Sequence, residues 1–317
     1  MLGKICGTGS YTPKKIVDNH DLAKIVETND EWIQERTGIV RRHIIEDETT
    51  VTMAAQAAKR ALEDAKIEAN EIDLILLSTI SSEVVLPCAA CEVQKLIGAK
   101  NATCFDLNAA CAGFLFAYNT AQAYMAQGIY KTVLVIGSES LSNLVNWQDR
   151  GTCILFGDGA GAALLKAEEG DLQPMITHSA GEKGEALTCK NNAANSNIKK
   201  EDTYMQMDGQ AVFKFAVRSV PSCIEELLEK AKMKKEEITH FILHQANLRI
   251  VEAVAKRLKQ PMEKFPVNLT EYGNTSSASI PILLDELNKK NVFKKGDKIV
   301  LAGFGAGLSW GASLLVW

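Results

Sequence analysis

Three residues of this 317-residue sequence have types and positions that could carry chemistry: Cys111, His244 and Asn274. Cys111 precedes an apolar stretch, 112–118, which predicts a buried helix. A thiol at the start of a helix lies at the positive end of the helix dipole, which favours the nucleophilic thiolate. From its position alone, Cys111 could equally be a small packing residue.

His244 and Asn274 each support two interpretations. His244 follows residues 239–243, which predict a buried strand, and reacting groups of α/β proteins gather at the carboxyl ends of strands. It could equally be a structural histidine with satisfied hydrogen bonds. Asn274 lies in a Gly/Asn/Ser segment that could be a plain turn. The three signals gain weight together, because an internal repeat relates their positions.

The repeat is visible as matched segments. Residues 65–76 match 231–242, and 133–137 match 299–303, both at a shift of 166 positions. The same shift sets Cys111 opposite residue 277, three positions after Asn274, so two helix N-termini are expected to face a common centre.

The final strand of the repeat has a different shift. Residues 161–165 match 311–315 at a shift of 150 positions, so the first copy carries about 16 extra residues, around 138–151. We expect a functional loop there. Residues 181–208 are polar and predict a long surface excursion, a kind of loop that is commonly functional or disordered.

Length and patterning predict an α/β protein with buried sheets. The chain exceeds the size of one growing core, and helical and apolar strand segments alternate in both halves. We expect halves at 1–170 and 171–317, the second repeating the first from about residue 175 to 316. The elements expected in the first half are strand 4–9, helix 52–66, strands 74–80, 132–136 and 161–166, and a helix after Cys111.

Composition excludes several classes. With 46% hydrophobic residues and a net charge of -4, the chain is globular and has no basic field for nucleic acid. Eight cysteines are too sparse for a disulfide scaffold. No export signal and no membrane-length apolar run is visible, so we expect a cytoplasmic protein without a membrane partner.

Two motif-like features are set aside. Cys88 and Cys91 have the spacing of half a zinc site, but no second pair follows, and Pro87 suggests a helix start. Packing is the favoured interpretation, and no metal is expected. The glycines of 157–161 precede a strand, whereas those of a dinucleotide motif follow one. The remaining cysteines without a partner pattern are Cys6, Cys104, Cys153, Cys189 and Cys223.

Over essentially its whole length, the sequence resembles the β-ketoacyl-acyl-carrier-protein synthase III family, the priming condensing enzymes of bacterial fatty acid synthesis in the thiolase superfamily. The matching segments are 30–39, 108–114, 157–162, 244–250, 273–276 and 303–311. The resemblance implies a duplicated thiolase-like fold, with two βαβαβ-type halves in five α-β-α-β-α layers. Cys111 would lie in the first half, and His244 and Asn274 in the second. One cysteine, one histidine and one asparagine separate this class from elongating enzymes with two histidines and from thiolases with a second catalytic cysteine.

The resemblance also implies the reaction. Cys111 would attack a short acyl-CoA, and the backbone N–H groups of Cys111 and Gly305 would form the oxyanion hole. Malonyl-acyl-carrier protein would then lose CO2, with His244 and Asn274 stabilising the enolate that attacks the acyl group. The product would be 3-ketoacyl-acyl-carrier protein. No permanent cofactor is implied, and a homodimer is.

Substrate contacts are expected from two sources. Trp32 and Arg36 share one face of a short helix, where an aromatic plane and a guanidinium suit the adenine and phosphates of CoA. Without the resemblance, an ordinary surface pair would be the favoured interpretation. Leu86 stands where many acetyl-selective members of the family have Phe, so it would open the acyl pocket to longer or branched primers. By resemblance, four more contacts are Arg150, Gly209, Asn247 and Phe304.

A basic cluster follows His244 on a helix of an otherwise acidic protein. It is a candidate dock for the acidic acyl-carrier protein, although such runs are usually solvated faces. Its members are Arg249, Lys256, Arg257 and Lys259, with Lys214 added by resemblance.

Two other functions remain as alternatives. An acyltransferase that moves the acyl group to an amine or hydroxyl would not need the intact His244 and Asn274. A non-catalytic scaffold would not need the nucleophile or the oxyanion glycines. The sequence leaves open the primer, the cognate carrier protein and any feedback by long-chain products.

Overall fold

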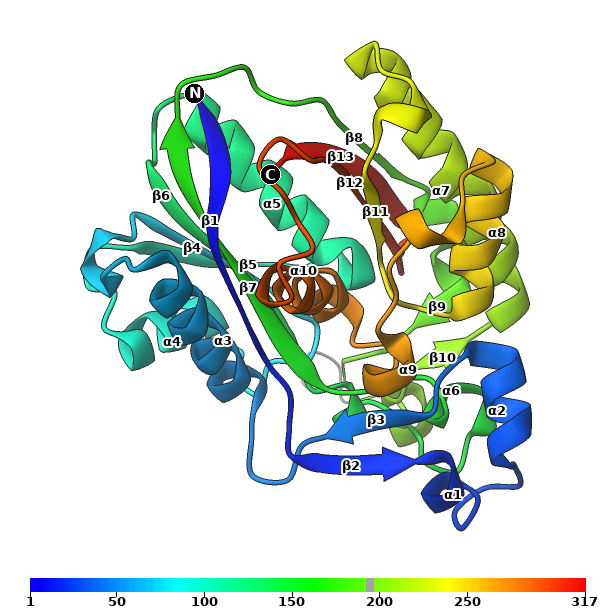
Figure 1. The fold of residues 1–317 in the computed structure, drawn as a ribbon. Coiled ribbons are helices and arrows are strands. Elements are labelled where there is room, and N and C mark those ends of the chain that lie inside the picture. The colour runs from blue at the N-terminus through cyan, green and yellow to red at the C-terminus, as the bar shows by residue number, and fades with distance from the viewer. Residues whose placement is uncertain (192–196) are drawn as a thin grey trace.

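The computed structural model describes residues 1–191 and 197–317, which build two main sheets (Figure 1). The first sheet has the order β1-β7-β6-β4-β5 and the second β11-β12-β13-β8. The first sheet comprises β1 (Leu2–Tyr11), β4 (Leu74–Ser78), β5 (Thr103–Leu107), β6 (Thr132–Glu139) and β7 (Gly159–Glu168). The second comprises β8 (Met175–Ser179), β11 (His240–Leu243), β12 (Lys298–Gly305) and β13 (Ser309–Val316).

Helices cover both faces of each sheet, which gives the expected five layers and confirms the predicted α/β class. Helices α5 (Gly113–Ala126) and α10 (Ser279–Lys289) lie between the sheets. The outer face of the first sheet carries α3 (Thr50–Ala65) and α4 (Ala89–Ile97). The outer face of the second carries α7 (Gly209–Ala231) and α8 (Leu248–Leu258).

Helix α5 is the buried central helix that its composition predicts. Phe114, Leu115 and Tyr118 pack in one cluster with side chains of both sheets and of α10. Its N-terminus comes close to that of α10, because a Cβ added at Gly113 would lie 3.6 Å from the Cβ of Ser277, which precedes α10. The same Cβ would clash with Ser78 Oγ, so only glycine fits at the start of α5.

The repeat is confirmed by the backbone. Strand β12 begins and ends 166 positions after β6, and left-handed residues recur at the same shift. Lys66 and Lys232 have φ of 54° and 53°, and Ala110 and Ser276 have φ of 46° and 50°. The predicted boundary at 170–171 falls between β7 and β8; the division into domains there stays a prediction.

A small outlying layer was not predicted. It contains the antiparallel pair β2 (Lys15–Asp18) and β3 (Arg41–Ile44) and four short helices in the same region (Figure 1). Of these elements, only the short helix α2, with its stop at Gly38, was expected, and that is confirmed. The helices are α1 (Asn19–Leu22), α2 (Asp30–Thr37), α6 (Arg150–Cys153) and α9 (Leu269–Tyr272).

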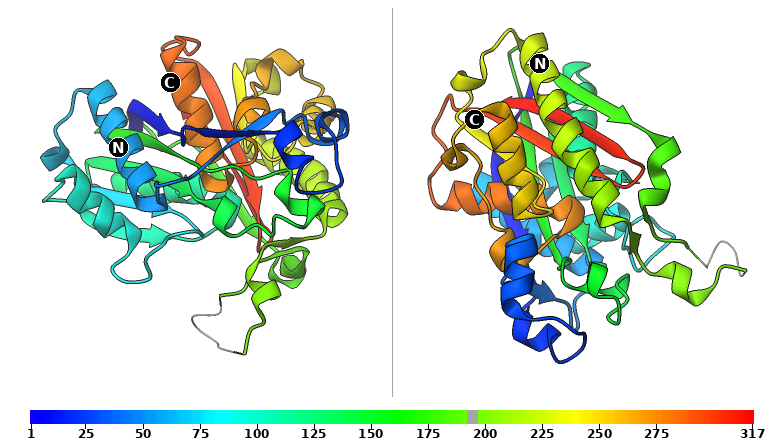
Figure 2. Two further views of the ribbon diagram at one scale, coloured as in Figure 1. Left: turned by 90° about the horizontal axis from the view of Figure 1, so that it is seen from below. Right: turned by 90° about the vertical axis from the view of Figure 1, so that its right-hand side faces the viewer.

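The polar excursion 181–208 projects from the two sheets where it is described (Figure 2). It contains η4 (Gly181–Ala186), β9 (Leu187–Thr188), η5 (Lys200–Thr203) and β10 (Gln206–Met207); residues 192–196 lie outside the described part. Other one-turn 3-10 helices are η1 (Ala69–Glu71), η2 (Ala110–Ala112), η3 (Leu141–Asn143), η6 (Lys235–Glu237), η7 (Met262–Lys264) and η8 (Ser276–Ala278).

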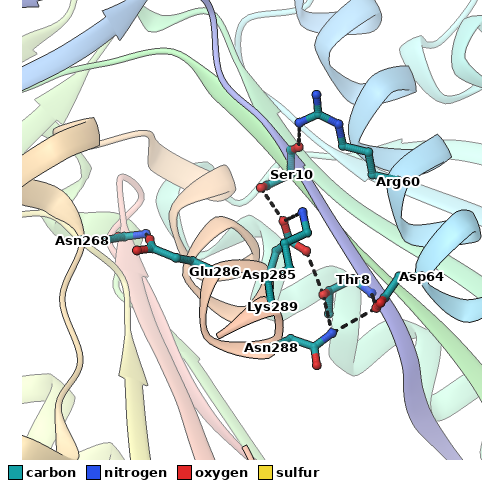
Figure 3. A network of polar contacts seen from close by, with 9 residues as sticks. All are labelled: Thr8, Ser10, Arg60, Asp64, Asn268, Asp285, Glu286, Asn288 and Lys289. Atoms are coloured by element: carbon teal, nitrogen blue, oxygen red, sulfur yellow. Dashed lines mark hydrogen bonds and ion pairs between the residues drawn. The ribbon is translucent and has the colours of Figure 1, made fainter. Parts of the chain in front are cut away.

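A buried polar cluster ties the two halves together (Figure 3). Asp285 on α10 accepts hydrogen bonds from the hydroxyls of Thr8 (2.9 Å) and Ser10 (2.5 Å) on β1, and it pairs with Lys289 at 2.6 Å. Since Asp285 is 1% exposed, its carboxylate depends on these partners for its hydrogen bonds. Within 1–191 and 197–317, no helix is long and apolar enough to cross a membrane.

Candidate active site

Cys111 lies where two cavities meet. The smaller, of about 180 Å³, is also lined by His244, Asn274 and Gly305 and reaches Arg36 and the first turns of α7 and α8. The larger, of about 1340 Å³, is lined by segment 80–85, the end of β5 and parts of the 181–208 excursion. Cys111 therefore lines both cavities.

Burial controls the acidity of Cys111. Desolvation raises the pKa of its thiol to about 12, and the neighbouring Ser276 hydroxyl lowers it by less. Burial therefore opposes the thiolate that the helix N-terminus was predicted to favour. The side chain is 7% exposed, and no cation contributes to its pKa.

His244 is held as a neutral imidazole. It follows β11, as predicted, and burial lowers its pKa to about 3. Its Nδ1 lies 2.7 Å from Ser279 Oγ, which also accepts the N–H of Gln245 at 3.3 Å. The edge of the imidazole ring meets Phe304, with ring centroids 5.4 Å apart. The ring is thus fixed from one side, with the cavity on the other.

Asn274 is fixed at both backbone and side chain. Its N–H donates to the carbonyl of Leu155 at 2.8 Å, and its carbonyl accepts from Gly157 at 3.0 Å. Its side-chain oxygen accepts the N–H of Ser276 at 2.9 Å. The side-chain NH2 is then the group that can donate to a ligand in the cavity.

Gly305 brings the end of β12 against Cys111. A Cβ at Gly305 would lie 2.7 Å from the Cys111 nitrogen and 3.0 Å from that of Ala112. Absence of a side chain is therefore a steric requirement at this point. The close approach is what two backbone N–H donors need if they are to share one oxyanion.

Glu139, a residue that sequence reasoning missed, lies beneath this site. It is fully buried, and burial raises its pKa. Its carboxylate accepts hydrogen bonds from Ser81 Oγ (2.6 Å) and Ser277 Oγ (2.9 Å). It also accepts from Ile80 N (3.0 Å) and Thr79 Oγ1 (3.2 Å). Glu139 thus anchors η8, which follows Asn274, to segment 79–81.

Trp32 contacts two guanidinium groups. The guanidinium carbons of Arg150 and Arg36 lie 4.8 Å and 5.6 Å from its ring centroid. Asn29 caps α2 by accepting the Trp32 N–H at 2.8 Å, and Arg150 donates to the carbonyl of Glu27 at 2.9 Å. The structure brings these three residues together, and Arg36 also lines the smaller cavity.

A second missed residue, Arg42, links the elements that carry Trp32 and Arg150. Arg42 is fully buried and donates to Asn19 Oδ1 at 2.9 Å and to the carbonyl of Ile154, directly after α6, at 2.7 Å. Asn19 in turn donates to Asp30, the first residue of α2, at 2.8 Å. Burial lowers the Arg42 pKa to about 10. Burial of a charged guanidinium costs free energy, which its hydrogen bonds must offset. The bonds of Arg42 therefore fix the positions of the elements that they join.

The other predicted contacts divide into two groups. Gly209, Asn247 and Phe304 line the smaller cavity, and Asn247 donates to the carbonyl of Arg36 at 3.0 Å. Leu86 forms the second group alone, because its side chain is 87% exposed and lines neither cavity. Within one chain, therefore, no contact supports the hypothesis that Leu86 opens the acyl pocket.

The basic residues lie on the outer helices beside the cavity. Arg249, Lys256 and Arg257 are exposed on α8, and Lys214 is exposed on the adjoining α7. The Arg249 guanidinium lies 5.6 Å from the ring centroid of Phe213, which lines the smaller cavity. In the described part of the chain, no group of three or more His, Cys, Asp or Glu residues could hold a metal ion.

Comparison with known proteins identifies the family. The family model for 3-oxoacyl-[acyl-carrier-protein] synthase III matches residues 105–184, and the model for its C-terminal part matches residues 228–317. A β-ketoacyl-[acyl-carrier-protein] synthase III of Clostridium novyi is 50% identical over 99% of this chain and 98% of that relative. The chain belongs to the synthase III family.

Solved structures of synthase III proteins have the same fold. The protein from Aquifex aeolicus VF5 matches with a TM-score of 0.94 and 46% identity, over 99% of this chain and all of that one. That from Pseudomonas aeruginosa PAO1 matches with a TM-score of 0.93 and 34% identity, over 100% of this chain and 98% of that one. The resemblance inferred from sequence motifs is confirmed.

The internal repeat could have identified one of the residues that sequence reasoning missed. Glu139 lies 166 positions before Gly305, so the predicted oxyanion position has a charged counterpart in the first copy. Ser279 and Arg42 gave no such signal, because their partners are 35 and 112 residues away in the chain.

Proposed function

We propose that this chain catalyses the decarboxylative condensation of a short acyl-CoA with malonyl-acyl-carrier protein, through an acyl-Cys111 intermediate, to initiate fatty acid synthesis. The observation that carries the proposal is the position of Cys111 at the junction of two cavities, with His244, Asn274 and Gly305 lining one of them. The smaller cavity, which extends from Cys111 to Arg36, suits the thioester arm.

In the first half-reaction, the sulfur of Cys111 attacks the thioester carbonyl. Negative charge on the carbonyl oxygen is stabilised by the N–H groups of Cys111 and Gly305. The C–S bond to CoA then breaks, and the thiol proton ends on the CoA sulfur. Because the resting thiol has a raised pKa, its proton is lost only as attack proceeds.

In the second half-reaction, His244 and Asn274 donate hydrogen bonds to the thioester oxygen of the malonyl group. Its C–C bond breaks, CO2 leaves, and the electron pair forms an enolate, so no base is required. The enolate carbon attacks acyl-Cys111, and the released sulfur takes up a proton. Ser279 supports this role if its hydroxyl donates to Nδ1, because the His244 proton then lies on Nε2.

The neutral state of His244 favours this chemistry. A donor with a pKa lowered to about 3 stabilises the enolate oxygen and remains unprotonated on Nδ1 across the physiological range. Each such donor is worth about 3 kcal/mol in a transition state.

Binding is assigned to two surfaces at the mouth of the smaller cavity. Trp32, Arg36 and Arg150 would hold the adenine and phosphates of CoA. The basic face of α7 and α8 would receive the acidic carrier protein, with Arg249 beside Phe213, which lines the cavity. We further propose a homodimer and a cytoplasmic location.

The test is the intact mass of the protein after mixing with a panel of acyl-CoAs, followed by malonyl-acyl-carrier protein. We expect one acyl adduct, absent in Cys111→Ala, that is discharged with release of CO2 only when the malonyl partner is added. A folded protein that takes no acyl group from any donor would overturn the proposal. Discharge to an amine or hydroxyl without CO2 would indicate the alternative acyltransferase.

A further inference from the structure

Two half-buried thiols face each other at the first turn of α4, outside both cavities. Cys88 is the N-cap of α4 and Cys91 its third residue; their Sγ atoms are 3.4 Å apart. The N–H of Cys91 donates to the carbonyl of Cys88 at 3.0 Å, which closes the turn around the pair. A third thiol, Cys104 on β5, lies alongside, with its carbonyl 3.9 Å from Cys88 Sγ.

The other cysteines have different surroundings. All eight are free; Cys111, Cys153 and Cys223 are buried. Cys6 and Cys189 are exposed, and each thiol contacts a backbone carbonyl. Among the described interactions, none of these five thiols has another thiol as its partner. The packing interpretation of the Cys88 and Cys91 motif therefore leaves the facing sulfurs unexplained.

We propose that Cys88 and Cys91 form a reversible dithiol–disulfide modification site, with a low-molecular-weight disulfide as the electron acceptor. The thiolate of Cys88 attacks one sulfur of the external disulfide, which gives a mixed disulfide and releases one thiol. The thiolate of Cys91 then attacks the Cys88 sulfur and releases the second thiol. Two protein thiols are oxidised, one external disulfide is reduced, and the two protons end on the released thiols.

The local geometry supports ring closure. The sulfurs need to shorten their separation from 3.4 Å to the ~2.05 Å of a disulfide. Cys88 has extended backbone angles, φ -63° and ψ 151°, and its carbonyl accepts the N–H groups of Cys91 at 3.0 Å and Glu92 at 3.4 Å, which holds the two cysteines close together. Within one chain the segment before it makes few contacts, since Val85 and Leu86 are 78% and 87% exposed.

Electrostatics favour the disulfide at equilibrium. The carboxylate of Asp106 accepts the N–H groups of Ala89 and Ala90 at 2.8 Å each, so a carboxylate already occupies the positive end of α4. The pKa of Cys91 is raised by its contact with Cys88 and by burial. Strongly oxidising CxxC pairs owe their potential to a stabilised thiolate in the reduced form, and this pair lacks that feature.

The site adjoins the active-site region. Residues 80–83 and Val85 line the cavity that contains Cys111, and Cys88 follows three residues later. A bond between Cys88 and Cys91 would fix the start of α4 directly after this segment. The modification does not use Cys111, so it stands independently of the proposed condensation.

The experiment equilibrates the reduced protein with mixtures of oxidised and reduced glutathione and then alkylates the remaining thiols. Intact mass and peptide mapping report the product. We expect a species with two fewer alkyl groups, no bound glutathione and a Cys88–Cys91 link. The matched variant Cys104→Ser should form the same link. Cys91→Ser should lose it and retain one glutathione on Cys88, and Cys88→Ser should form neither the link nor that adduct.

Three results would overturn the proposal. One is a protein that keeps all eight thiols in excess oxidised glutathione. Another is a stable glutathione adduct on Cys88 without ring closure. The third is a link that joins Cys91 to Cys104 and disappears in Cys104→Ser.

Discussion

One added methyl group at Gly305 tests the proposed oxyanion hole directly. A Cβ there would lie 2.7 Å from the Cys111 nitrogen, whereas ordinary contacts begin at 3.4 Å. Gly305 is absent from the residues with positive φ, so Gly305→Ala meets a steric conflict without backbone strain. Gly303, two residues earlier on β12, is the matched control, because its added Cβ would come no closer than 3.6 Å to any atom.

The size of the effect follows from the required movement. The Cys111 backbone and the end of β12 must separate by about 0.7 Å to relieve the contact, which moves one N–H donor away from the oxyanion. Displacements approaching 1 Å, or the loss of one such donor, reduce rates by about 10²- to 10³-fold. We therefore expect acyl loading of Gly305→Ala to slow by that factor, equivalent to about 3–4 kcal/mol.

Single-turnover loading from acetyl-CoA, followed by intact mass, measures this rate. Thermal unfolding of both variants confirms that they fold, since overpacking costs about 1–3 kcal/mol of stability. Alkylation of Cys111 by iodoacetamide is the chemical control, because that reaction forms no oxyanion and should change little. If folded Gly305→Ala loads within threefold of Gly303→Ala, the oxyanion assignment is refuted.

Three further outcomes can be measured. Because the thiol pKa of Cys111 is about 12, its alkylation, followed by peptide mapping, should accelerate about tenfold per unit between about pH 6 and 9; a plateau near neutrality would contradict the burial argument. Asp285→Ala should lower the free energy of unfolding by about 3 kcal/mol in denaturant titration, since the buried Thr8 hydroxyl loses its charged acceptor. Exposed Asp171→Ala should leave it unchanged. Arg42→Met should raise the KM for acyl-CoA about tenfold, relative to Arg41→Met, but not that for an acyl-pantetheine, which lacks the nucleotide; equal effects on both donors would indicate a structural role alone.

The sequence predicted the parts of the fold that depend on local pattern and on the repeat. Apolar runs gave β4, β6, β7 and the central helix α5 to within a few residues, because fully buried strands and helices have continuous apolar sequence. The shift of 166 positions placed Cys111 and Asn274 at helix starts that meet.

What depended on tertiary context was not predicted. The β2–β3 pair is short and half-exposed, so its pattern is weak. The raised pKa of Cys111 arises from desolvation by segments distant in the chain, and the dipole argument used only its own helix. Arg42 resembles any surface arginine until the fold surrounds it.

Duplication also explains how one site differs from its counterpart. At the shift of 166 positions, Cys111 corresponds to Ser277 and Gly305 to Glu139, and the preceding left-handed turns coincide. In one copy, Gly305 leaves the space beside the nucleophile open to a substrate oxygen. In the other, the Glu139 carboxylate accepts the Ser277 hydroxyl at 2.9 Å. The Glu139 side chain thus lies beside Ser277, where the first-named copy has only the hydrogen of Gly305 beside Cys111. The hydrogen bond between Ser277 and Glu139 consequently stabilises the backbone, whereas the space beside Cys111 stays available to a substrate.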